Sequence, residues 1–488
     1  MLWVHLQRVM LPVALSQTLS LLVMVGFGSV LLGVGFAWAV TRHEFPGSRL
    51  FDWALALPLA FPAYVLAYVY VSGLAFDAPI ATGWRALGLP ASLFPEVRSL
   101  GGAAVVLVLA LFPYVYLLMR ATLLRHGSAA FDAARTLGAS PARAFFRVVL
   151  PVTRAAWMGG LSLVLLETLA DFGAMRMLGR DTLSTLIVQS WVGLGSLALA
   201  AQLALAMVLG VVAVGLLLHA FGRRSAPPGS ALAAPRRQRL AGLLGWCISA
   251  AAALVVLLGV AWPLLQLFAW LPLSRIGAAM PWAAVQGTLL IAAATAIAAV
   301  AVALGFAALR RRFPGDRVLA GFSQAAGLGY AVPGTVMAVA VFWCLFAVER
   351  ALGVGAAGLS TGLFALVLAL LMRFQRVGLA AVDAALSTLR PSLMHSAALL
   401  GAGRLSRWWR VGLPVLRPGL FAAALLVFVE AMKELPATLM LRPFGWDTLA
   451  IQIYTATSEG LWNDAALPAL LLVAVGTLPV LLLLRRGQ

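Results

Sequence analysis

The chain has 488 residues, of which 63% are hydrophobic and only 10% are charged, and its formal net charge is +19. Ordinary soluble chains are about a quarter charged, so this composition, with a mean hydropathy of +1.00, excludes a soluble globular protein. The alternating pattern of an outer-membrane barrel is absent. Helices satisfy their own backbone groups in lipid, and the sequence therefore predicts an all-α, polytopic helical bundle.

Apolar runs of roughly 20 residues, the length at which an α-helix crosses about 30 Å of hydrocarbon, recur along the chain. The first run is too long for the apolar core of a signal peptide, so we expect it to be retained as a helix. The sequence predicts about 11 transmembrane helices. The predicted spans are residues 11–40, 52–76, 101–124, 152–175, 195–221, 241–272, 282–309, 318–348, 361–380, 415–441 and 463–484.

The basic residues predict how the chain is oriented. If the segment that holds Asp132 is cytoplasmic, 26 Lys and Arg residues lie inside and 8 lie outside, with Lys433 within a span. This bias obeys the positive-inside rule, and the inverted orientation would violate it. We therefore expect the N-terminus outside and the C-terminus in the cytoplasm. Membrane orientation then accounts for the positive net charge, so the charge does not indicate nucleic-acid binding.

An internal repeat divides the chain into two halves. Residues 1–221 form the predicted first half and residues 241–488 the second, joined by a cytoplasmic linker, residues 222–240, that is rich in Pro, Ser and Arg. Copies that run through the membrane in the same direction imply a pseudo-twofold along the membrane normal and a central path. The matched segments are Phe45-Pro46-Gly47 with Phe313-Pro314-Gly315, Pro62 with Pro333, and Asp181-Thr182-Leu183 with Asp447-Thr448-Leu449.

Each half contains a polar, Arg-bearing insert between apolar runs. We name Asp132 to Pro151 the first insert and His395 to Pro414 the second insert; their glycines, Gly138 and Gly401, are 263 positions apart and each stands thirteen residues before the proline. An acidic residue suits a helix start, and glycine permits a turn into a second short helix. Such a helix pair can dock on a partner and transmit a rigid-body movement. The alternative is an ordinary amphipathic loop helix.

The inserts resemble the EAA loops of ATP-binding-cassette importer permeases, in which Glu-Ala-Ala is followed by Gly and then by Leu-Pro at fixed spacing. The second insert departs from the pattern, because His395 and Ser396 stand where Glu and Ala are expected. By this resemblance the predicted ATPase-coupling residues are Asp132, Ala133, Ala134, Gly138, Leu150, Pro151, His395, Ala397, Gly401, Leu413 and Pro414.

Over nearly its whole length the chain resembles the fused, two-half ferric-iron permeases of bacterial inner membranes, with residues 61–70, 167–173 and 433–439 as the segments most like that family. The resemblance implies a type I importer fold and two cytoplasmic ATPase subunits docked on the inserts. It also implies a periplasmic binding protein that delivers ferric iron to the outer loops near residues 77–100, 176–194 and 442–462. Alternatives are the same importer class for another substrate such as thiamine, or an ion-driven secondary transporter.

Four acidic residues within apolar spans are the candidate translocation-path residues: Glu167, Asp171, Glu430 and Glu434. Burying a charge at mid-bilayer costs about 2.5–3.5 kcal/mol on insertion scales, so such residues should face a cavity or a partner. Each pair is spaced four apart and is predicted to share one helix face. They could attract a cation in the path; alternatively, they stabilise the core, with Lys433 neutralising a neighbour.

Other chemistry is not indicated by the sequence. The only lysine, Lys433, follows Met432, so no P-loop exists and ATP must be used by a separate subunit. Tyr64 and Tyr68 could ligate ferric iron, but aromatic residues on a helix more often serve packing. Neither the histidines nor the two cysteines form a metal-binding pattern. We therefore predict a transport subunit with no catalytic residues, no metal site and no cofactor of its own.

Overall fold

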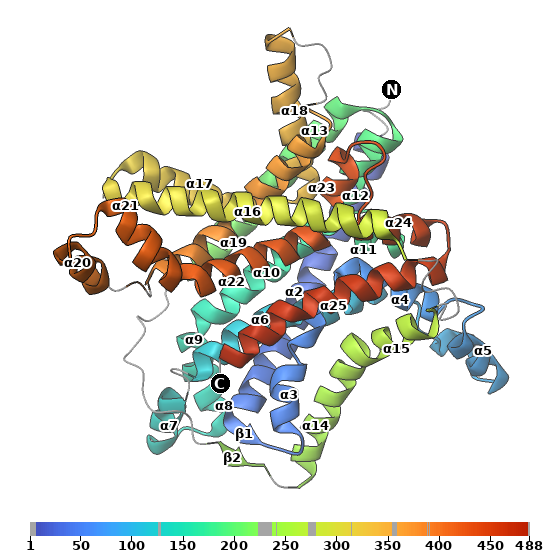
Figure 1. The fold of residues 1–488 in the computed structure, drawn as a ribbon. Helices are drawn as coiled ribbons and strands as arrows, with labels where there is room; N and C mark the ends of the chain where they lie inside the picture. Colours follow the sequence, from blue (N-terminus) through green and yellow to red (C-terminus); the bar gives the residue numbers. More distant parts are fainter. Residues whose placement is uncertain are drawn as a thin grey trace. The chain divides into compact units, whose positions relative to one another are not determined.

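The structure is a computed structural model that describes residues 6–124, 128–222, 237–240, 242–271, 280–313, 315–353, 359–387, 389 and 391–486. Within these residues the regular structure is helical except for the two-residue strands β1 and β2 (Figure 1). The predicted all-α class is therefore confirmed. Most of the predicted linker, residues 222–240, and Pro314 of the repeated Phe-Pro-Gly segment lie outside the described residues.

The chain forms two compact units, of which unit 1 comprises Met1–Met280 with Ile453–Gln488. Its elements are η1 (Leu6–Met10), α2 (Leu11–Arg42), β1 (His43–Glu44), α3 (Ser48–Ala54), η2 (Leu57–Ala60), α4 (Ala63–Gly73), α5 (Pro79–Ala86), η3 (Ala91–Leu93), α6 (Leu100–Thr122), α7 (Ser128–Thr136), α8 (Pro141–Ala144), η5 (Phe145–Val149), α9 (Leu150–Val152), α10 (Arg154–Ala170), α11 (Gly173–Met177), α12 (Leu183–Val188), η6 (Gln189–Gly193), α13 (Leu197–Gly222), β2 (Gln238–Arg239), α14 (Leu243–Val256), η7 (Leu257–Ala261), α15 (Trp262–Ala269) and α25 (Trp462–Arg486).

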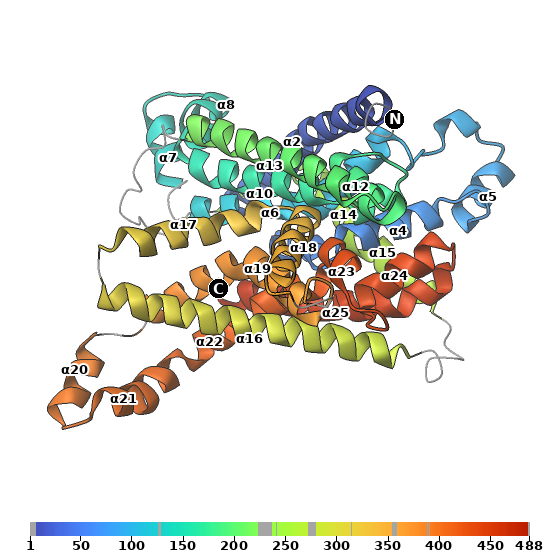
Figure 2. The ribbon, with the colours of Figure 1, turned by 90° about the horizontal axis from the view of Figure 1, so that it is seen from above.

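Unit 2 comprises Pro281–Gln452. Its elements are α16 (Trp282–Arg312), α17 (Arg317–Ala331), α18 (Gly334–Ala351), α19 (Leu363–Ser387), α20 (Pro391–Leu399), α21 (Arg404–Arg407), η9 (Trp408–Gly412), α22 (Leu413–Lys433), α23 (Pro436–Leu441) and the start of α24 (Leu449–Ser458). Three of these, α16, α19 and α22, pack side by side (Figure 2). They bury Ala303, Val382 and Leu416 in the core of the unit.

The packing division follows contacts, whereas the predicted division into residues 1–221, 222–240 and 241–488 follows a sequence repeat, so the halves stay a prediction. The two divisions differ because α14, η7 and α15, the first helical stretch of the predicted second half, pack on α3, η2, α4 and α6 of unit 1. The end of the linker is also fixed in unit 1: His43–Glu44 pairs in parallel with Gln238–Arg239, and Arg237 Nη2 lies 3.6 Å from Asp52 Oδ2.

The number of spans is close to the prediction. In the described residues eight helices are long and apolar enough to cross a membrane, and two bent helix pairs raise the number to ten. The predicted span 463–484 corresponds to α25, whose apolar stretch over the described side chains, Trp462–Thr477, is shorter than a full span. A polytopic membrane bundle is therefore confirmed, with fewer complete spans in the described residues than the predicted eleven.

Two predicted spans are broken at matched prolines. In place of the predicted span 52–76 the chain has a bent pair, Ser48–Ala60 and Ala63–Gly73, whose axes differ by 92°. The predicted span 318–348 divides into α17 and α18. In both cases the proline, Pro62 or Pro333, is the N-cap of the following helix, with φ and ψ near −58° and 140° or −57° and 147°. Proline disfavours helical backbone in the preceding residue. The matched prolines thus break the spans at their helix starts.

Glycines bring the first three long helices of unit 1 into close contact around Val115 of α6. A Cβ placed on Gly33 of α2 would lie 2.6 Å from Val115 Cβ, and one on Gly160 of α10 would lie 2.6 Å from Val115 Cα. Small residues at such positions let helix backbones approach closely, which is how helices associate in lipid. The α2–α6–α10 packing therefore requires glycine at both positions.

We predict that Gly160→Ala destabilises the chain, since the added methyl group meets the Val115 backbone, which cannot rotate away. Overpacking of this kind costs about 1–3 kcal/mol. Gly159→Ala is the matched control, because its Cβ would meet nothing closer than Leu118 Cδ1 at 3.7 Å. Thermal unfolding in detergent should show a lower Tm for Gly160→Ala alone. Equal Tm values for the two variants would contradict the close-packing account.

Candidate functional site

The two inserts have the same backbone course. In the first insert α7 ends at a turn where Gly138 has φ 85°, and in the second α20 ends where Gly401 has φ 80°. The amide of Ala139 donates to the Ala134 carbonyl at 3.0 Å, and that of Ala402 donates to the Ala397 carbonyl at 3.1 Å. This is a Schellman ending, which favours glycine because positive φ is strained for other residues. The structure thus has the predicted turn in both copies.

Each turn leads into a short α-helix and then into a five-residue π-helical segment, η5 in the first insert and η9 in the second. The two π-helical segments begin 263 positions apart, at Phe145 and Trp408, so the repeat extends to this uncommon backbone. After it the copies diverge. The first copy bends by 70° between residues 141–152 and 154–170, whereas in the second Trp408–Lys433 forms one apolar span.

The predicted coupling residues differ in accessibility. The two inserts have the same backbone course, but not every predicted coupling side chain is exposed. Exposed are Asp132, Ala133, Gly138, Pro151, His395, Gly401 and Pro414, half-buried are Leu150, Ala397 and Leu413, and Ala134 is buried.

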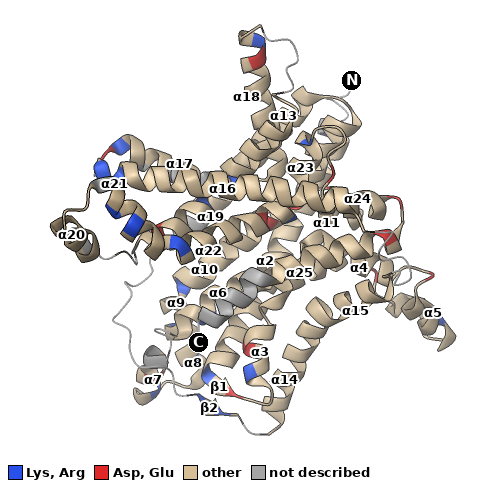
Figure 3. Cartoon of the chain, viewed as in Figure 1, with Lys and Arg blue, Asp and Glu red and all other residues tan. Residues whose placement is uncertain are grey.

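Large apolar side chains, which the sequence prediction missed, are exposed on both inserts. Leu137 and Leu400 are 89% and 87% exposed, and Phe146 and Trp409 are both 64% exposed. Each pair is again separated by 263 positions, and this spacing could have identified them. Figure 3 shows Lys and Arg gathered at the end of each unit that carries its insert. Exposed apolar residues in a basic setting are typical of a protein-binding surface.

Asp132 is the residue of the first insert with a defined ionic partner. Its Oδ1 lies 2.5 Å from Arg42 Nη2, and its Oδ2 lies 3.3 Å from Arg42 Nη1. Arg42 is the last residue of α2, and its side chain is 5% exposed. The pKa of neighbouring His43 is lowered, chiefly by burial and further by the Arg42 cation. His43 is therefore neutral at pH 7, and Arg42 provides the positive charge that faces Asp132.

The four acidic residues of the spans separate into two kinds. Glu167 and Glu430 are half-buried within α10 and α22. Asp171 and Glu434 lie just beyond those helices, which end at Ala170 and Lys433, and so do not continue the helix face as predicted. Asp171 Oδ1 accepts a hydrogen bond from the Ala174 amide at 2.7 Å. Asp171 thus caps the start of α11.

Glu434 has the most complete set of partners. Its carboxylate accepts from the amides of Ala437 and Thr438 at 3.0 Å each and pairs with Arg373 Nη1 at 3.1 Å. The side chains of Glu434 and Arg373 are 2% and 10% exposed, and a Cβ on Gly334 would collide with both. Glu434 therefore joins the α22–α23 break to α19.

Aromatic residues of α4 serve packing. Tyr68 is fully buried, its hydroxyl donates to the Trp462 carbonyl, and its ring lies 5.4 Å from that of Trp270. The Tyr68 phenol, held in this way, is not placed to ligate a transported ion. Among the described residues no group of three or more His, Cys, Asp or Glu side chains is arranged to hold a metal.

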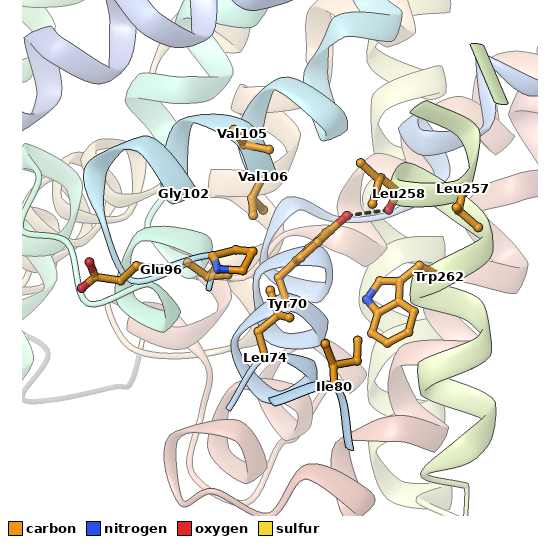
Figure 4. A pocket seen from close by; sticks show the side chains of 12 residues that line it. Tyr70, Leu74, Ile80, Glu96, Gly102, Val105, Val106, Leu257, Leu258 and Trp262 are labelled. Carbon is orange, nitrogen blue, oxygen red and sulfur yellow. Dashed lines mark hydrogen bonds between the residues drawn. The ribbon is translucent and has the colours of Figure 1, made fainter. Parts of the chain in front are cut away.

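A cavity of about 430 Å³ opens beside α4 and α6 (Figure 4). Its walls are apolar, and the hydroxyl of Tyr70 donates to the Leu258 carbonyl of the π-helical η7 at 2.8 Å. Glu96 lies at its edge with the carboxylate turned away from the other lining side chains. The cavity suits an apolar group and does not resemble an ion path.

Comparison with known proteins finds similarity to transport components. Residues 29–228 match the binding-protein-dependent transport system inner membrane components. The chain is 27% identical over 482 residues, 96% of its length and 89% of the relative, to the Fe(3+)-transport system permease protein FbpB 2 of Haemophilus influenzae.

Shorter similarities relate the chain to other permeases. It is 30% identical over 158 residues to the molybdenum transport system permease protein ModB of Escherichia coli K12, covering 30% of this chain and 62% of ModB. It is 30% identical over 190 residues to the sulfate transport system permease protein CysW of the same strain, covering 37% and 64%. The chain is thus similar over residues 29–228 to the binding-protein-dependent transport system inner membrane components, and over nearly its whole length to an Fe(3+)-transport system permease protein.

Proposed function

We propose that this permease forms the translocation path of an ATP-driven, binding-protein-dependent importer for ferric iron. The observation that carries the proposal is the pair of inserts with one backbone course and the same exposed apolar residues. Similarity to a ferric-iron permease over 96% of the chain supports the choice of substrate. The chain itself performs no covalent chemistry and binds no cofactor.

Two copies of a cytoplasmic ABC ATPase subunit dock on the inserts, one on each. Leu137 with Phe146, and Leu400 with Trp409, are the apolar anchors, because exposed large side chains gain most from burial in a partner's groove. ATP is used in those subunits, since the chain has no P-loop. A periplasmic binding protein delivers the substrate to the loops near residues 77–100, 176–194 and 442–462.

Movement reaches the membrane because each insert is continuous with a long helix. In the second unit η9 runs directly into α22, and in the first the insert joins α10 through a bend. A rigid-body displacement of a docked insert therefore moves the helix that carries Glu430 or Glu167. Packed helices shift between discrete arrangements rather than deforming continuously, which suits switching between outward and inward access.

Glu167 and Glu430 are the acidic residues that we assign to the path. Both are half-buried at matched positions of α10 and α22, and a carboxylate at such depth favours a cationic substrate. Asp171 and Glu434 are instead assigned to the helix breaks that follow. Asp171 accepts a hydrogen bond from the Ala174 amide, and Glu434 accepts from the amides of Ala437 and Thr438.

A second candidate is the same machine with an oxyanion substrate, favoured by the similarity to the sulfate and molybdenum permeases. Reconstitution of the complex separates the candidates. Ferric-loaded binding protein should stimulate ATP hydrolysis and iron uptake, whereas sulfate- or molybdate-loaded binding proteins should not. Stimulation by an oxyanion alone would replace iron as the substrate.

Substituting the exposed leucines should weaken ATPase docking. Leu137→Ser and Leu400→Ser are expected each to lower the affinity for the ATPase subunit about tenfold, since a central apolar anchor contributes more than 1 kcal/mol. Affinity is measured by pull-down of the purified ATPase at graded concentrations.

Leu87→Ser serves as the matched control, because Leu87 is 77% exposed but lies in a loop far along the chain from either insert. That variant should bind ATPase as the wild type does. If all three variants bind equally, the inserts are not the docking surface.

Neutralising the half-buried acids should impair transport without unfolding the chain. Glu167→Gln and Glu430→Gln are expected to reduce ferric uptake while leaving Tm near the wild-type value. Glu434→Gln should instead lower Tm, because removing one partner of a buried ion pair costs about 3–5 kcal/mol. Uptake and thermal unfolding are measured on the same preparations. Unchanged uptake in Glu167→Gln and Glu430→Gln would remove both residues from the path.

A further inference from the structure

The first insert is fastened to the end of the first long helix by an ion pair and an aromatic cluster. Beside the Arg42–Asp132 contact, the Arg42 guanidinium lies 4.8 Å from the centre of the Phe131 ring. Trp38 of α2 packs on Phe131 and Phe145 with ring centroids 5.0 and 5.1 Å apart. A guanidinium held by both a carboxylate and a ring is restrained in direction as well as distance.

In unit 2 the arginine at the position of Arg42 pairs with a helix and not with the insert. Arg310 stands three residues before Phe313, as Arg42 stands three before Phe45. Arg310 Nη2 contacts both carboxylate oxygens of Asp383 in α19, at 2.6 and 2.7 Å. At the position of Asp132 the second insert has His395, which is exposed. In the described part of unit 2, no ion pair joins α20 to the neighbouring helices.

The apolar contacts that hold the second insert are also less tightly packed than those of the first insert. Phe306, Met394 and Trp408 replace Trp38, Phe131 and Phe145, and Phe306 and Met394 pack against the core of α16, α19 and α22. A cavity of about 320 Å³ remains there, with Gly305, Ala308 and Trp408 in its wall. Unit 1 has the larger Ala37 and Val40 at the positions of Gly305 and Ala308.

We propose that Arg42 and Asp132 are positioning residues that fix the first insert to α2, whereas among the described residues of the second insert no ion pair does the same. The inference rests on the proposed function in one respect, that the inserts receive ATPase movement. The first insert then transmits the ATPase movement to α10 as a rigid body. The second insert first shifts within unit 2 and only then moves α22. Asp132 acts within the chain, through Arg42, and not as a contact to the ATPase.

Amide hydrogen exchange of the purified permease tests the fastening without any partner. In the wild type, α7 should exchange more slowly than α20. Asp132→Asn should accelerate exchange of α7 about tenfold, because local opening no longer breaks a charge-assisted contact. Asp132→Glu, which keeps the charge, should remain near the wild type. Asp383→Asn is the control, because it breaks an ion pair of the same kind that involves no insert, and should leave both inserts unchanged.

The reconstituted complex then tests positioning. Asp132→Asn should bind the ATPase with unchanged affinity while its stimulation of ATP hydrolysis falls several-fold, and Asp132→Glu should restore stimulation. Unchanged exchange in α7 overturns the proposal, and so does a loss of ATPase affinity without a change in exchange, which would make Asp132 a direct contact. If the wild type recruits no ATPase, the proposed function fails, while the exchange result still decides whether Arg42 holds the insert.

Discussion

A helix break within an apolar span leaves the first backbone amides of the following helix without partners, and lipid cannot satisfy them. The structure meets this constraint with acidic side chains. Both α10 and α22 end within the stretches predicted as continuous spans, at Ala170 and Lys433. Asp171 and Glu434 then accept hydrogen bonds from the amides of α11 and α23. Each acidic side chain thus links the end of a long helix to the start of the short helix that follows.

This constraint explains what could be predicted from the sequence and what could not. Hydropathy located the long helices well, since α6, α13 and α16 begin and end within a few residues of the predicted spans. Hydropathy did not reveal the helix breaks, because a single acidic residue or proline scarcely alters the mean hydropathy of 20 residues. The four-residue spacing of Glu430 and Glu434 suggested a shared helix face, and only the observed helix end shows that the two residues differ in environment.

The site was predicted to a similar extent. The spacing from Gly138 to Pro151 fixed the course of the insert, since positive φ and a helix start impose local requirements that are visible in sequence. Exposure of Leu137 and Leu400 was not visible, because leucine is common throughout a membrane protein whether it faces lipid, core or partner. The ionic partner of Asp132 could not be predicted either, because Arg42 lies 90 residues away in the sequence. From the sequence, Arg42 is only one of the charges that indicate membrane orientation.

The two inserts share one backbone course but differ in the ion pairs around them. Gly138 and Gly401 preserve the turn, and η5 and η9 preserve the π-helical segment. The charges around them have been redistributed, with Arg42 paired to the insert in unit 1 and Arg310 paired to α19 in unit 2. Since His395 removes the acidic partner and Asp383 supplies another, the two changes compensate each other: a buried or half-buried guanidinium must keep an anion nearby. The departure from the sequence pattern at His395 thus goes together with a different partner for the cation, which in unit 2 is bound to α19 and not to the insert.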